Sequence, residues 1–321
     1  MLGAIQMSDK FQLDERIVVF GFGAQGSAQA MNLKESGRDV SVFLRGQSRR
    51  LVEAREAGML VSSDPGGAAR EARVAALLIP DGAQPAFYRE VLEPHLPPGA
   101  LLLFAHGFAI HYRQIAPRND LDVALCAPMA QGAAVRGDFV SGGGVPVLIA
   151  VAQDATGRAI ERAKNYAEGI SRSGPFIETT FAEEVESDLF AEQAVLCGGM
   201  PELVHAAFET LVDGGYDPRI AYFSCLRELR AIVAVMDRHG IAGLMERISD
   251  TALYGALTRG PRLIDSGVRA RMREALEEIR SGSFAKELVE DAQNGQPVLK
   301  KLVEHLKGHP IEGVHREFRR R

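Results

Sequence analysis

Hydrophobic residues in the first half of the chain occur in short continuous runs, separated by stretches with helical spacing. The runs cover residues 17–20, 40–44, 74–79, 100–104, 122–126 and 146–151. Runs rich in Leu and β-branched residues are typical of strands buried on both faces of a parallel sheet. Between the first two runs, residues 24–36 are spaced like a helix, and Gly37 favours its end. The alternation predicts a doubly wound, mainly parallel α/β sheet.

The pattern changes near residue 180. Thr180 and Glu183 have the spacing of a capping box, which marks the start of a helix. Helical patterns then follow at 181–213, 218–239, 241–256, 266–280, 283–293 and 297–307. We therefore expect an α/β domain over residues 1–180 and an all-α domain over residues 181–321.

Composition limits the classes of partner. The 321 residues include 37 Lys and Arg and 42 Asp and Glu, a net charge of −5 with no dominant basic face. Nucleic acid is therefore not an expected partner, and the basic run 315–321 is interpreted as a solvated tail. Apolar stretches such as 74–80 are far shorter than the ~20 residues of a membrane helix, so we expect no membrane partner either.

The compartment follows from the first residues and the cysteines. Residues 1–10 lack the basic start and the apolar core of a signal peptide. Cys126, Cys197 and Cys225 are odd in number, lack CxxC spacing and lie in apolar sequence. These features favour buried thiols in a reducing, cytoplasmic environment.

The sequence GFGAQG at 21–26 follows the first predicted strand and opens the first predicted helix. In a Rossmann fold, Gly21 would allow the tight turn, Gly23 would let a pyrophosphate approach, and Gly26 would let helix and strand pack closely. The start of the helix would then face the phosphates with its partial positive charge. The alternative is a glycine-rich turn that binds nothing.

The segment after the second strand, residues 44–50, indicates which dinucleotide binds. NAD-dependent enzymes usually have an acidic residue here for the ribose hydroxyls, and this segment has none. It carries Arg45, Ser48, Arg49 and Arg50, which suit a 2′-phosphate. We therefore expect NADPH rather than NADH. The alternative is a solvated basic loop at the start of a helix.

A second constellation lies in the predicted all-α half. Asp188 and Glu192 are one helical turn apart, so both carboxylates project from one side of a helix. The residues between them are apolar, and we expect that side to point inward. Two buried carboxylates repel each other unless a cation compensates, and Mg²⁺ is the simplest choice. The alternative is an exposed acidic pair without a ligand.

The order of motifs along nearly the whole chain resembles the ketol-acid reductoisomerase family of the short, class I type. The matching segments are the glycine loop, 104–108, 142–146, 177–181, 188–199, 215–218, 221–223, 248–249, 254–255, 260–262, 284–286 and 309–312. Family enzymes convert 2-acetolactate-type substrates to 2,3-dihydroxy acids. Two Mg²⁺ ions promote an alkyl shift, and NADPH reduces the resulting 2-keto acid. The resemblance implies a Rossmann domain, a knotted all-α domain and a homodimer with shared active sites.

The resemblance also implies residue roles. Asp188 would bridge both metals, Glu192 would hold one, and Glu228 would approach from the partner subunit. Ser249 would contact the substrate carboxylate, and His106 would lie beside nicotinamide and substrate. The expected dinucleotide-binding residues are Gly21, Phe22, Gly23, Ala24, Gln25, Gly26, Arg45, Ser48, Arg49, Pro80, Asp81, His106 and Gly132.

Departures from the family pattern are concentrated at positions where the family has catalytic and metal-binding residues. Met129 follows Ala127-Pro128 where the family has Lys, and Ala130-Gln131-Gly132 replaces Gly-Pro-Gly. A pair of Glu residues is reduced to Ser224 and Glu228. Arg227 stands where His is usual, and Asp250 where Asn is usual. The alkyl shift needs the missing ammonium and the second metal, whereas hydride transfer needs less.

Three hypotheses follow. The first is an NADPH-dependent reductase that transfers hydride to a C=O or C=N group of a small substrate and has lost the isomerase step. In this case Mg²⁺ binding is weakened or absent, and the pathway is a specialised biosynthetic one. The second is an authentic ketol-acid reductoisomerase in which Arg227 or Arg136 replaces the missing charge. The third is a non-catalytic NADPH-binding protein.

Overall fold

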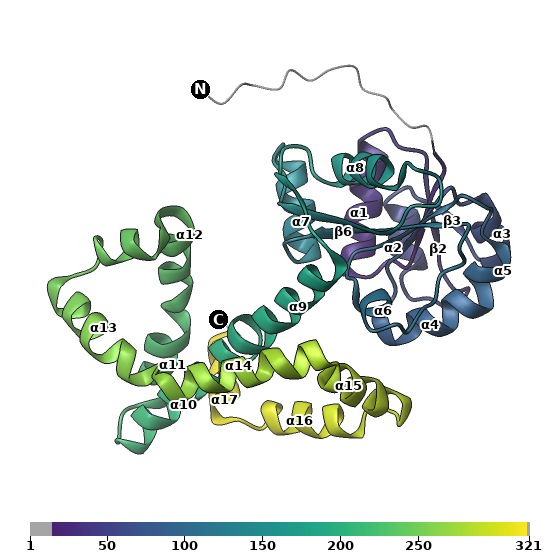
Figure 1. Cartoon of the computed structure of the whole chain (residues 1–321). Coiled ribbons are helices and arrows are strands. Elements are labelled where there is room, and N and C mark those ends of the chain that lie inside the picture. Colours follow the sequence, from purple (N-terminus) through teal and green to yellow (C-terminus); the bar gives the residue numbers. More distant parts are fainter. Residues whose placement is uncertain (1–14, 320–321) are drawn as a thin grey trace. The chain divides into compact units, whose positions relative to one another are not determined.

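The N-terminal part of the chain is built on one sheet of eight strands in the computed structural model, which describes residues 15–319 (Figure 1). The strands are β1 (Ile17–Phe20), β2 (Val40–Phe43), β3 (Leu60–Ser62), β4 (Val74–Leu77), β5 (Leu101–Phe104), β6 (Asp122–Pro128), β7 (Val147–Gln153) and β8 (Phe176–Glu178). Each predicted apolar run overlaps a strand, and β3 and β8 are additional. The segment 1–10, used above to argue against a signal peptide, lies outside the described residues.

The strand order is β3-β2-β1-β4-β5-β6-β7-β8. Its first six positions follow the order of dinucleotide-binding folds. Strands β1 to β6 are parallel, β7 pairs antiparallel with β6, and β8 runs parallel to β7. The prediction of a doubly wound, mainly parallel sheet is confirmed.

Helices cover both faces of this sheet (Figure 1). They are α1 (Ala24–Glu35), α2 (Leu51–Glu56), α3 (Pro65–Glu71), η1 (Asp81–Ala83), α4 (Gln84–Phe87), η2 (Tyr88–Leu92), α5 (Glu93–His95), α6 (Phe108–His111), α7 (Gly132–Val140) and α8 (Ala159–Ile170). Alternate residues of β1 enter opposite cores. Val19 packs with Leu33 of α1 and Tyr166 of α8, whereas Val18 packs with residues of α3 and η2. Burial on both faces explains why the central strands are continuously apolar.

The second half of the described chain is helical, as predicted. Its elements are α9 (Phe181–Ala191), η3 (Glu192–Leu196), α10 (Gly199–Asp213), α11 (Pro218–Tyr222), η4 (Phe223–Arg227), α12 (Leu229–Met245), α13 (Asp250–Leu263), α14 (Ser266–Ser281), α15 (Ser283–Gln293), α16 (Pro297–Lys307) and α17 (Pro310–Arg319). Two compact units meet inside α9, between Val185 and Glu186. The functional division at residue 180 remains a prediction.

Three predicted helices are interrupted in the structure. The expected helix 181–213 is interrupted by the π turn η3, and the expected helix 218–239 by the π turn η4. Gly240, whose φ of 71° is non-helical, kinks α12 at the break expected between helices 218–239 and 241–256. The expected helix 241–256 is instead divided between the end of α12 and α13, which begins at Asp250. Each interruption changes the direction of side chains around it, and π turns occur frequently at functional sites.

The end of the chain is a helix rather than the solvated tail expected for residues 315–321. In α17, Ile311 is buried with Phe208 and Tyr222. His315 hydrogen-bonds the Tyr222 hydroxyl at 2.8 Å, and Phe318 stacks on the Tyr222 ring. The basic residues lie on the other side of α17, which is an amphipathic helix. The run of basic residues in the sequence did not indicate this helix. Residues 320–321 lie outside the description. Within residues 15–319, no helix is long and apolar enough to span a membrane.

Candidate functional site: a dinucleotide cradle and a His–Glu–Asp cluster

The glycine loop between β1 and α1 is shaped by backbone contacts that only glycine allows. Gly21 has a φ of +114°, and a Cβ there would lie 2.7 Å from the Leu78 carbonyl oxygen. A Cβ on Gly26 would lie 2.5 Å from the Gly21 carbonyl oxygen. A Cβ on Gly23 would meet no heavy atom within 4 Å. Two glycines therefore hold the turn closed, and the third leaves open space above the backbone.

The start of α1 borders that open space. Gly23 is the N-cap and offers no side-chain cap, and the first turn carries no acidic residue. The first N–H groups of α1 are thus left for an anion, which suits a pyrophosphate. Phe22 is 4% exposed and packs in the core, so only its backbone is available to a ligand. The loop fits a dinucleotide.

The loop after β6 is joined to the glycine loop. Gln25 donates from Nε2 to the Ala130 carbonyl oxygen at 2.8 Å. A Cβ on Gly132 would lie 2.1 Å from the Ala24 carbonyl oxygen, so α7 starts directly against α1. Met129 donates its N–H to the Pro146 carbonyl at 2.8 Å, while its side chain is 59% exposed. Met129 thus lies where the carboxyl ends of the parallel strands meet, which we call the carboxyl edge of the sheet. It is beside the dinucleotide cradle, formed by the glycine loop 21–26 and the start of α1, and its side chain is exposed.

All three arginines of the basic segment after β2 are exposed, and one of them is paired with a carboxylate. Arg50 forms an ion pair with Glu53 at 2.6 Å, and its N–H bonds the Ser48 hydroxyl oxygen. Arg45 and Arg49 are exposed. Among residues 15–319, neither forms an ion pair. These two guanidiniums and the Ser48 hydroxyl remain suited to a phosphate.

The residues after β4 also lie at the carboxyl edge of the sheet. Pro80 caps the short η1 turn, and the Asp81 carboxylate accepts a hydrogen bond from Gln84 Nε2 at 3.0 Å. Gln84 also donates to the Ile79 carbonyl at 3.0 Å. Because β4 is next to β1 in the sheet, this turn flanks the glycine loop.

His106, just after β5, is held by a carboxylate that the sequence analysis did not identify. Glu184 of α9 is 3% exposed. One of its oxygens lies 3.1 Å from His106 Nδ1, and the other accepts the Gly107 N–H at 3.0 Å. A carboxylate accepts, so Nδ1 is the donor and Nε2 is the other ring nitrogen. Glu184 therefore fixes the orientation of the imidazole. In the sequence, the spacing of four residues between Glu184 and Asp188 indicates that the two carboxylates lie on the same side of a helix.

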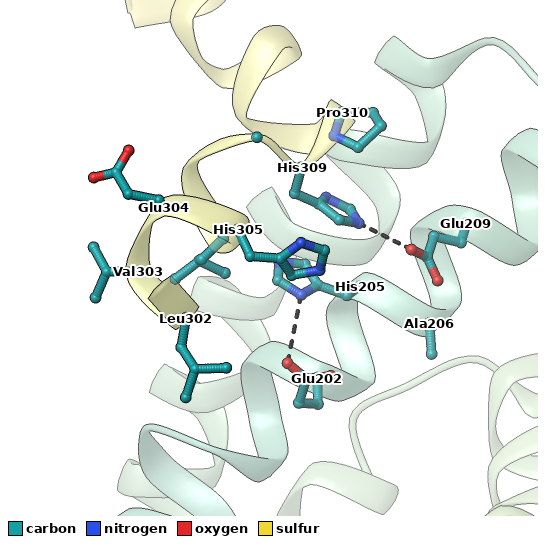
Figure 2. A pocket seen from close by; sticks show the side chains of 12 residues that line it. Glu202, His205, Ala206, Glu209, Leu302, Val303, Glu304, His305, His309 and Pro310 are labelled. Carbon is teal, nitrogen blue, oxygen red and sulfur yellow. Dashed lines mark hydrogen bonds and ion pairs between the residues drawn. The ribbon is translucent and has the colours of Figure 1, made fainter. Parts of the chain in front are cut away.

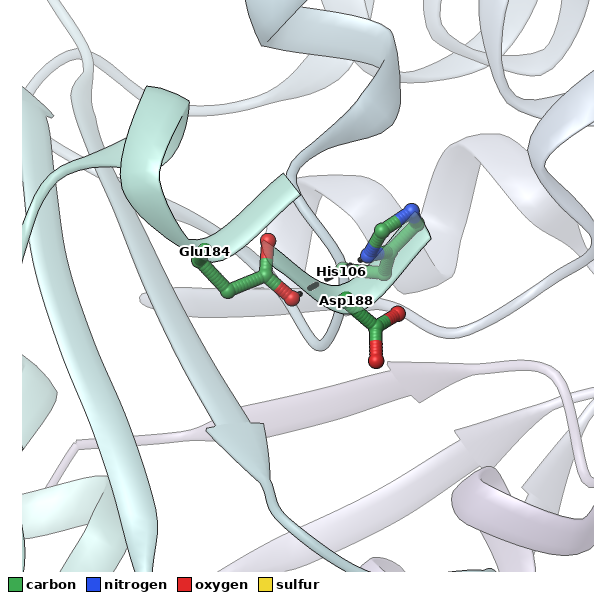
Figure 3. A group of neighbouring side chains, drawn as sticks. All are labelled: His106, Glu184 and Asp188. Carbon is green, nitrogen blue, oxygen red and sulfur yellow. Dashed lines mark hydrogen bonds and ion pairs between the residues drawn. The ribbon is translucent and has the colours of Figure 1, made fainter. Parts of the chain in front are cut away.

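Asp188 joins this pair. Ligand atoms of His106, Glu184 and Asp188 lie within 4.8 Å of one another, and Figure 3 shows the two carboxylates one turn apart on α9. Donors of this kind suit a divalent cation. Asp188 and Glu192 are both exposed in the single chain, so the expectation that they face inward is wrong for it. The apolar Leu189 between them is buried.

Glu192 begins the π turn η3. Its carbonyl accepts from the N–H groups of Cys197 and Gly198, at 2.8 and 2.9 Å. A Cβ on Gly198 would lie 2.2 Å from the Gln193 carbonyl oxygen, so this tight exit requires glycine. The π turn widens the helix where the second acidic residue of the pair stands.

The remaining predicted residues lie on other elements of the C-terminal unit. Ser224 and Arg227 are exposed on η4, and Glu228 is exposed at the N-cap of α12. The Ser249 hydroxyl oxygen caps α13 by accepting the Ala252 N–H at 3.3 Å. Ser249 thus has a structural role, although its O–H can still donate.

Arg136 does not replace the family's lysine. Its guanidinium donates to the Asn32 side chain at 2.9 Å and forms an ion pair with Glu35. Both partners belong to the last turns of α1, whereas the glycine loop is at the first turn. The hypothesis that Arg136 supplies the missing charge is therefore wrong.

A cavity of about 900 Å³ lies elsewhere, within the C-terminal unit. In Figure 2 it is bordered by α10 and by the segment joining α16 to α17. His205 and His309 stack there with ring centroids 4.1 Å apart, and His309 bonds Glu209 at 3.1 Å. The predicted site residues lie outside its lining.

Comparison with known proteins identifies the scaffold. The NADPH-binding domain of acetohydroxy acid isomeroreductase matches residues 12–174, and the C-terminal domain of ketol-acid reductoisomerase matches residues 181–321. The chain belongs to the ketol-acid reductoisomerase family. It is an NAD(P)H-dependent oxidoreductase of that family, with a Rossmann domain followed by a helical region.

Solved structures agree with this assignment. An NADH-preferring ketol-acid reductoisomerase from an uncultured archean is 39% identical, with a TM-score of 0.93. The match covers 97% of this chain and 96% of that one. A semialdehyde dehydrogenase NAD-binding protein from Cupriavidus necator, in complex with calcium and NAD, is 19% identical with a TM-score of 0.63, covering 83% of this chain and 99% of that one. The second match shows similarity of fold alone.

Proposed function

We propose that this member of the ketol-acid reductoisomerase family reduces a C=O or C=N group of a small substrate with NADPH and no longer catalyses the alkyl shift. The observation that carries the proposal is Met129. Its exposed, uncharged side chain stands at the carboxyl edge beside the dinucleotide cradle. Arg136, the nearest arginine along the chain, is bound to Asn32 and Glu35.

The alkyl shift is the more demanding step. It develops alkoxide charge that an ammonium and metal ions stabilise. Met129 offers neither charge nor a proton, and Ser224 lacks the carboxylate that helps recruit a second metal. Removing one such group commonly costs ~10²–10⁴ in rate, so the two changes together suffice to abolish isomerisation.

Reduction needs fewer groups. The reduced nicotinamide, when bound, supplies hydride. The glycine loop, Gly132 and the start of α1 would hold its pyrophosphate, and Pro80 and Asp81 would border it. His106, oriented by Glu184, would hold a proton at Nε2 for the oxygen or nitrogen of the substrate. Reduction would need only these parts of the site.

The preference for NADPH is part of the proposal. Arg45, Ser48 and Arg49 would contact the 2′-phosphate, for which a fork of guanidinium donors is well suited. The similar archaeal enzyme prefers NADH. A comparison of Michaelis constants for the two dinucleotides tests this preference, and equal or better use of NADH would contradict it.

A metal ion and a second subunit complete the proposed site. Asp188 and Glu192 would hold one Mg²⁺, which would polarise the reacting group. Glu228 would be supplied by the partner subunit of a homodimer with a knotted helical domain. Exposed apolar residues of α13, such as Tyr254, Leu257 and Leu263, support association, because such patches commonly mark interfaces. We place the enzyme in the cytoplasm and in specialised metabolism.

A second candidate is an authentic ketol-acid reductoisomerase, favoured by the 39% identity to such an enzyme. The variant Met129→Lys with Ser224→Glu separates the two. If the proposal holds, this variant gains turnover of 2-acetolactate with Mg²⁺ and NADPH that the unmodified protein lacks. Turnover by the unmodified protein at a rate normal for the family would eliminate the proposal.

A further inference from the structure

Three polar side chains inside the Rossmann domain form a row, which we call the polar row. Tyr166 of α8 and Gln29 of α1 are buried. The Tyr166 hydroxyl donates to Gln29 Oε1 at 2.8 Å, and Gln29 Nε2 donates to Gln25 Oε1 at 3.1 Å. Gln25 Nε2 in turn donates to the Ala130 carbonyl at 2.8 Å. The polar row thus links α8, through α1, to loop 129–131, which joins β6 to α7 and carries Met129.

The hydrogen bonds of the polar row all point in one direction. The Ala130 carbonyl can only accept, so Gln25 presents its NH₂ group to it and its oxygen to Gln29. Gln29 must then present its NH₂ group to Gln25 and its oxygen to Tyr166. Burial raises the pKa of the Tyr166 phenol, which therefore keeps its proton and donates. The phenol and the backbone carbonyl together fix the orientation of both amides.

A buried polar row contributes more to geometry than to stability. Burying an amide or a hydroxyl costs free energy that its hydrogen bonds only offset. Replacing both partners of such a bond by apolar groups of the same shape can be nearly neutral. A buried network with every member bonded does, however, hold its side chains in one arrangement. The consequence of the polar row is therefore sought at its outer end, at Ala130.

Gln25 stands where the glycine loop and loop 129–131 meet. It is the second residue of α1, so its backbone N–H is one of the first N–H groups of the helix, which suit a pyrophosphate. Its side chain holds Ala130, the residue after Met129. Loop 129–131 is otherwise fastened through its backbone, as by the Met129 N–H on the Pro146 carbonyl. Gln25 therefore adds a side-chain tie between the two loops.

We propose that Tyr166, Gln29 and Gln25 are positioning residues, which fix loop 129–131 relative to the glycine loop and thereby align the substrate with the dinucleotide. This inference rests on the function proposed above, which places the substrate beside Met129. It adds residues of the core that touch neither ligand through their side chains. Because a displacement of about 1 Å between reacting groups can cost up to about 10²-fold in rate, the alignment depends on how firmly the loop is held.

The test removes the hydroxyl at the far end of the polar row. In Tyr166→Phe, Gln29 Oε1 loses its donor. Turning the Gln29 amide over does not help, because its oxygen would then face Gln25 Oε1. The matched control is Tyr88→Phe, since the Tyr88 hydroxyl is also buried and accepts the Arg118 N–H at 2.9 Å. Each variant loses one buried hydrogen bond, so a similar loss of stability is expected in both.

Amide hydrogen exchange of the full-length protein, followed by mass spectrometry, reports on the loop without any substrate. In Tyr166→Phe, the peptide 129–135 should exchange about tenfold faster than in the unmodified protein, the factor expected from the loss of one hydrogen bond. In Tyr88→Phe, this peptide should stay within about twofold of the unmodified protein. Unchanged exchange in Tyr166→Phe, or equal acceleration in both variants, would overturn the inference.

A second variant tests whether the row acts as a unit. Gln25→Met removes the amide next to Ala130 and keeps a side chain of similar length. It should also accelerate exchange in peptide 129–135. Adding Tyr166→Phe to it should accelerate exchange no further, because both substitutions act through the same row of hydrogen bonds. Additive effects would mean that Tyr166 acts on the loop by another route, and would contradict the proposal.

Kinetics distinguishes positioning from a purely structural role. In Tyr166→Phe, kcat for 2-methyl-1-pyrroline should fall about tenfold, while the Kd for NADPH should change by less than about twofold. Tyr88→Phe should leave both nearly unchanged. An unchanged kcat in Tyr166→Phe, or an equal loss of kcat and NADPH affinity, would overturn the inference. If the unmodified protein instead turns over 2-acetolactate at a normal family rate, the proposed function fails, and the same comparison with 2-acetolactate still decides the inference.

Discussion

The two ends of strand β6 differ in charge and in burial. At the amino end, Asp122 is fully buried and accepts from Arg162 Nη1 at 2.6 Å and from the Thr156 hydroxyl at 2.6 Å. Arg162 also donates to the carbonyls of Gly99 and Arg73. At the carboxyl end, Met129 is exposed and neutral. The charged groups at the amino end are buried and paired with each other, whereas the residue at the carboxyl end is exposed to solvent.

The difference separates stability from function along a single strand. A buried charge must be fully paired, so the network at the amino end is a structural requirement. An exposed position at the carboxyl edge can change without loss of the fold, and dinucleotide-binding folds place their ligands at this edge. Replacements that alter the chemistry therefore occur where they cost the fold little.

The largest expected effect is at the amino end. Asp122→Asn leaves the buried Arg162 charge poorly compensated and should lower the free energy of unfolding by about 3 kcal/mol. Asp120→Asn, which affects an exposed pair with Arg118, should cost less than about 1 kcal/mol. Urea denaturation of both variants measures this. A cost for Asp122→Asn no greater than the control would break the contrast between the two ends.

The same pair predicts a pH effect. Burial pushes the pKa of Asp122 upward, but hydrogen bonds from Thr156 and Arg162 outweigh it and hold the pKa below its usual value. A lowered folded pKa gives stability that is present above the unfolded pKa of about 3.9 and lost as pH falls through the folded pKa. Between pH 5 and pH 3, the unmodified protein should therefore lose more stability than Asp122→Asn.

Substitutions at two glycines of the glycine loop should separate an effect on folding from an effect on NADPH binding. Gly26→Ala forces a Cβ against the Gly21 carbonyl and should cost about 1–3 kcal/mol of unfolding free energy. Gly23→Ala meets open space and should change stability by less than about 0.5 kcal/mol. Yet it should weaken NADPH binding about tenfold or more, because the Cβ enters the space left for the pyrophosphate. Unchanged affinity for Gly23→Ala would place the pyrophosphate elsewhere.

Glu184 should act through His106. Glu184→Gln removes the carboxylate that orients the ring and should lower kcat about 10- to 100-fold with little change in NADPH affinity. Glu183→Gln is the matched control, since Glu183 is exposed and bonds Thr179. Steady-state kinetics and fluorescence titration measure both quantities. An equal loss in both variants would indicate that the helix, and not the pair, was disturbed.

The smallest expected effect concerns the dinucleotide. Arg45→Gln with Arg49→Gln should raise KM for NADPH about tenfold and leave KM for NADH nearly unchanged. Arg50→Gln, which removes an arginine paired with Glu53, should raise it less. Equal sensitivity of NADH and NADPH would show that the arginines do not contact the 2′-phosphate.

Local patterns predicted much of the fold. The apolar runs predicted the central strands because those strands are buried on both faces, and the glycines predicted the cradle because backbone contacts require them. The edge strands β3 and β8 were missed because they are short and partly exposed. The π turns were missed because their helical periodicity continues nearly unbroken.

Long-range contacts account for the errors in the site. Glu184 binds His106 across 78 positions, and Arg136 binds Asn32 across 104. Neither partner is visible in the local sequence, although Glu184 is spaced four residues from Asp188. Phe22 looked like a ligand contact because it lies inside the glycine motif, yet the packing of β1 and α1 buries it.

The most direct test of the central claim is the rate at which the unmodified protein oxidises NADPH with 2-acetolactate and Mg²⁺, compared with its rate on 2-methyl-1-pyrroline. If isomerisation is lost and reduction retained, the imine is reduced while acetolactate turnover lies at least ~10²-fold below a rate normal for the family, as expected from losing a single acid–base or electrostatic group. Comparable turnover of acetolactate, with formation of the 2,3-dihydroxy acid, would contradict the account.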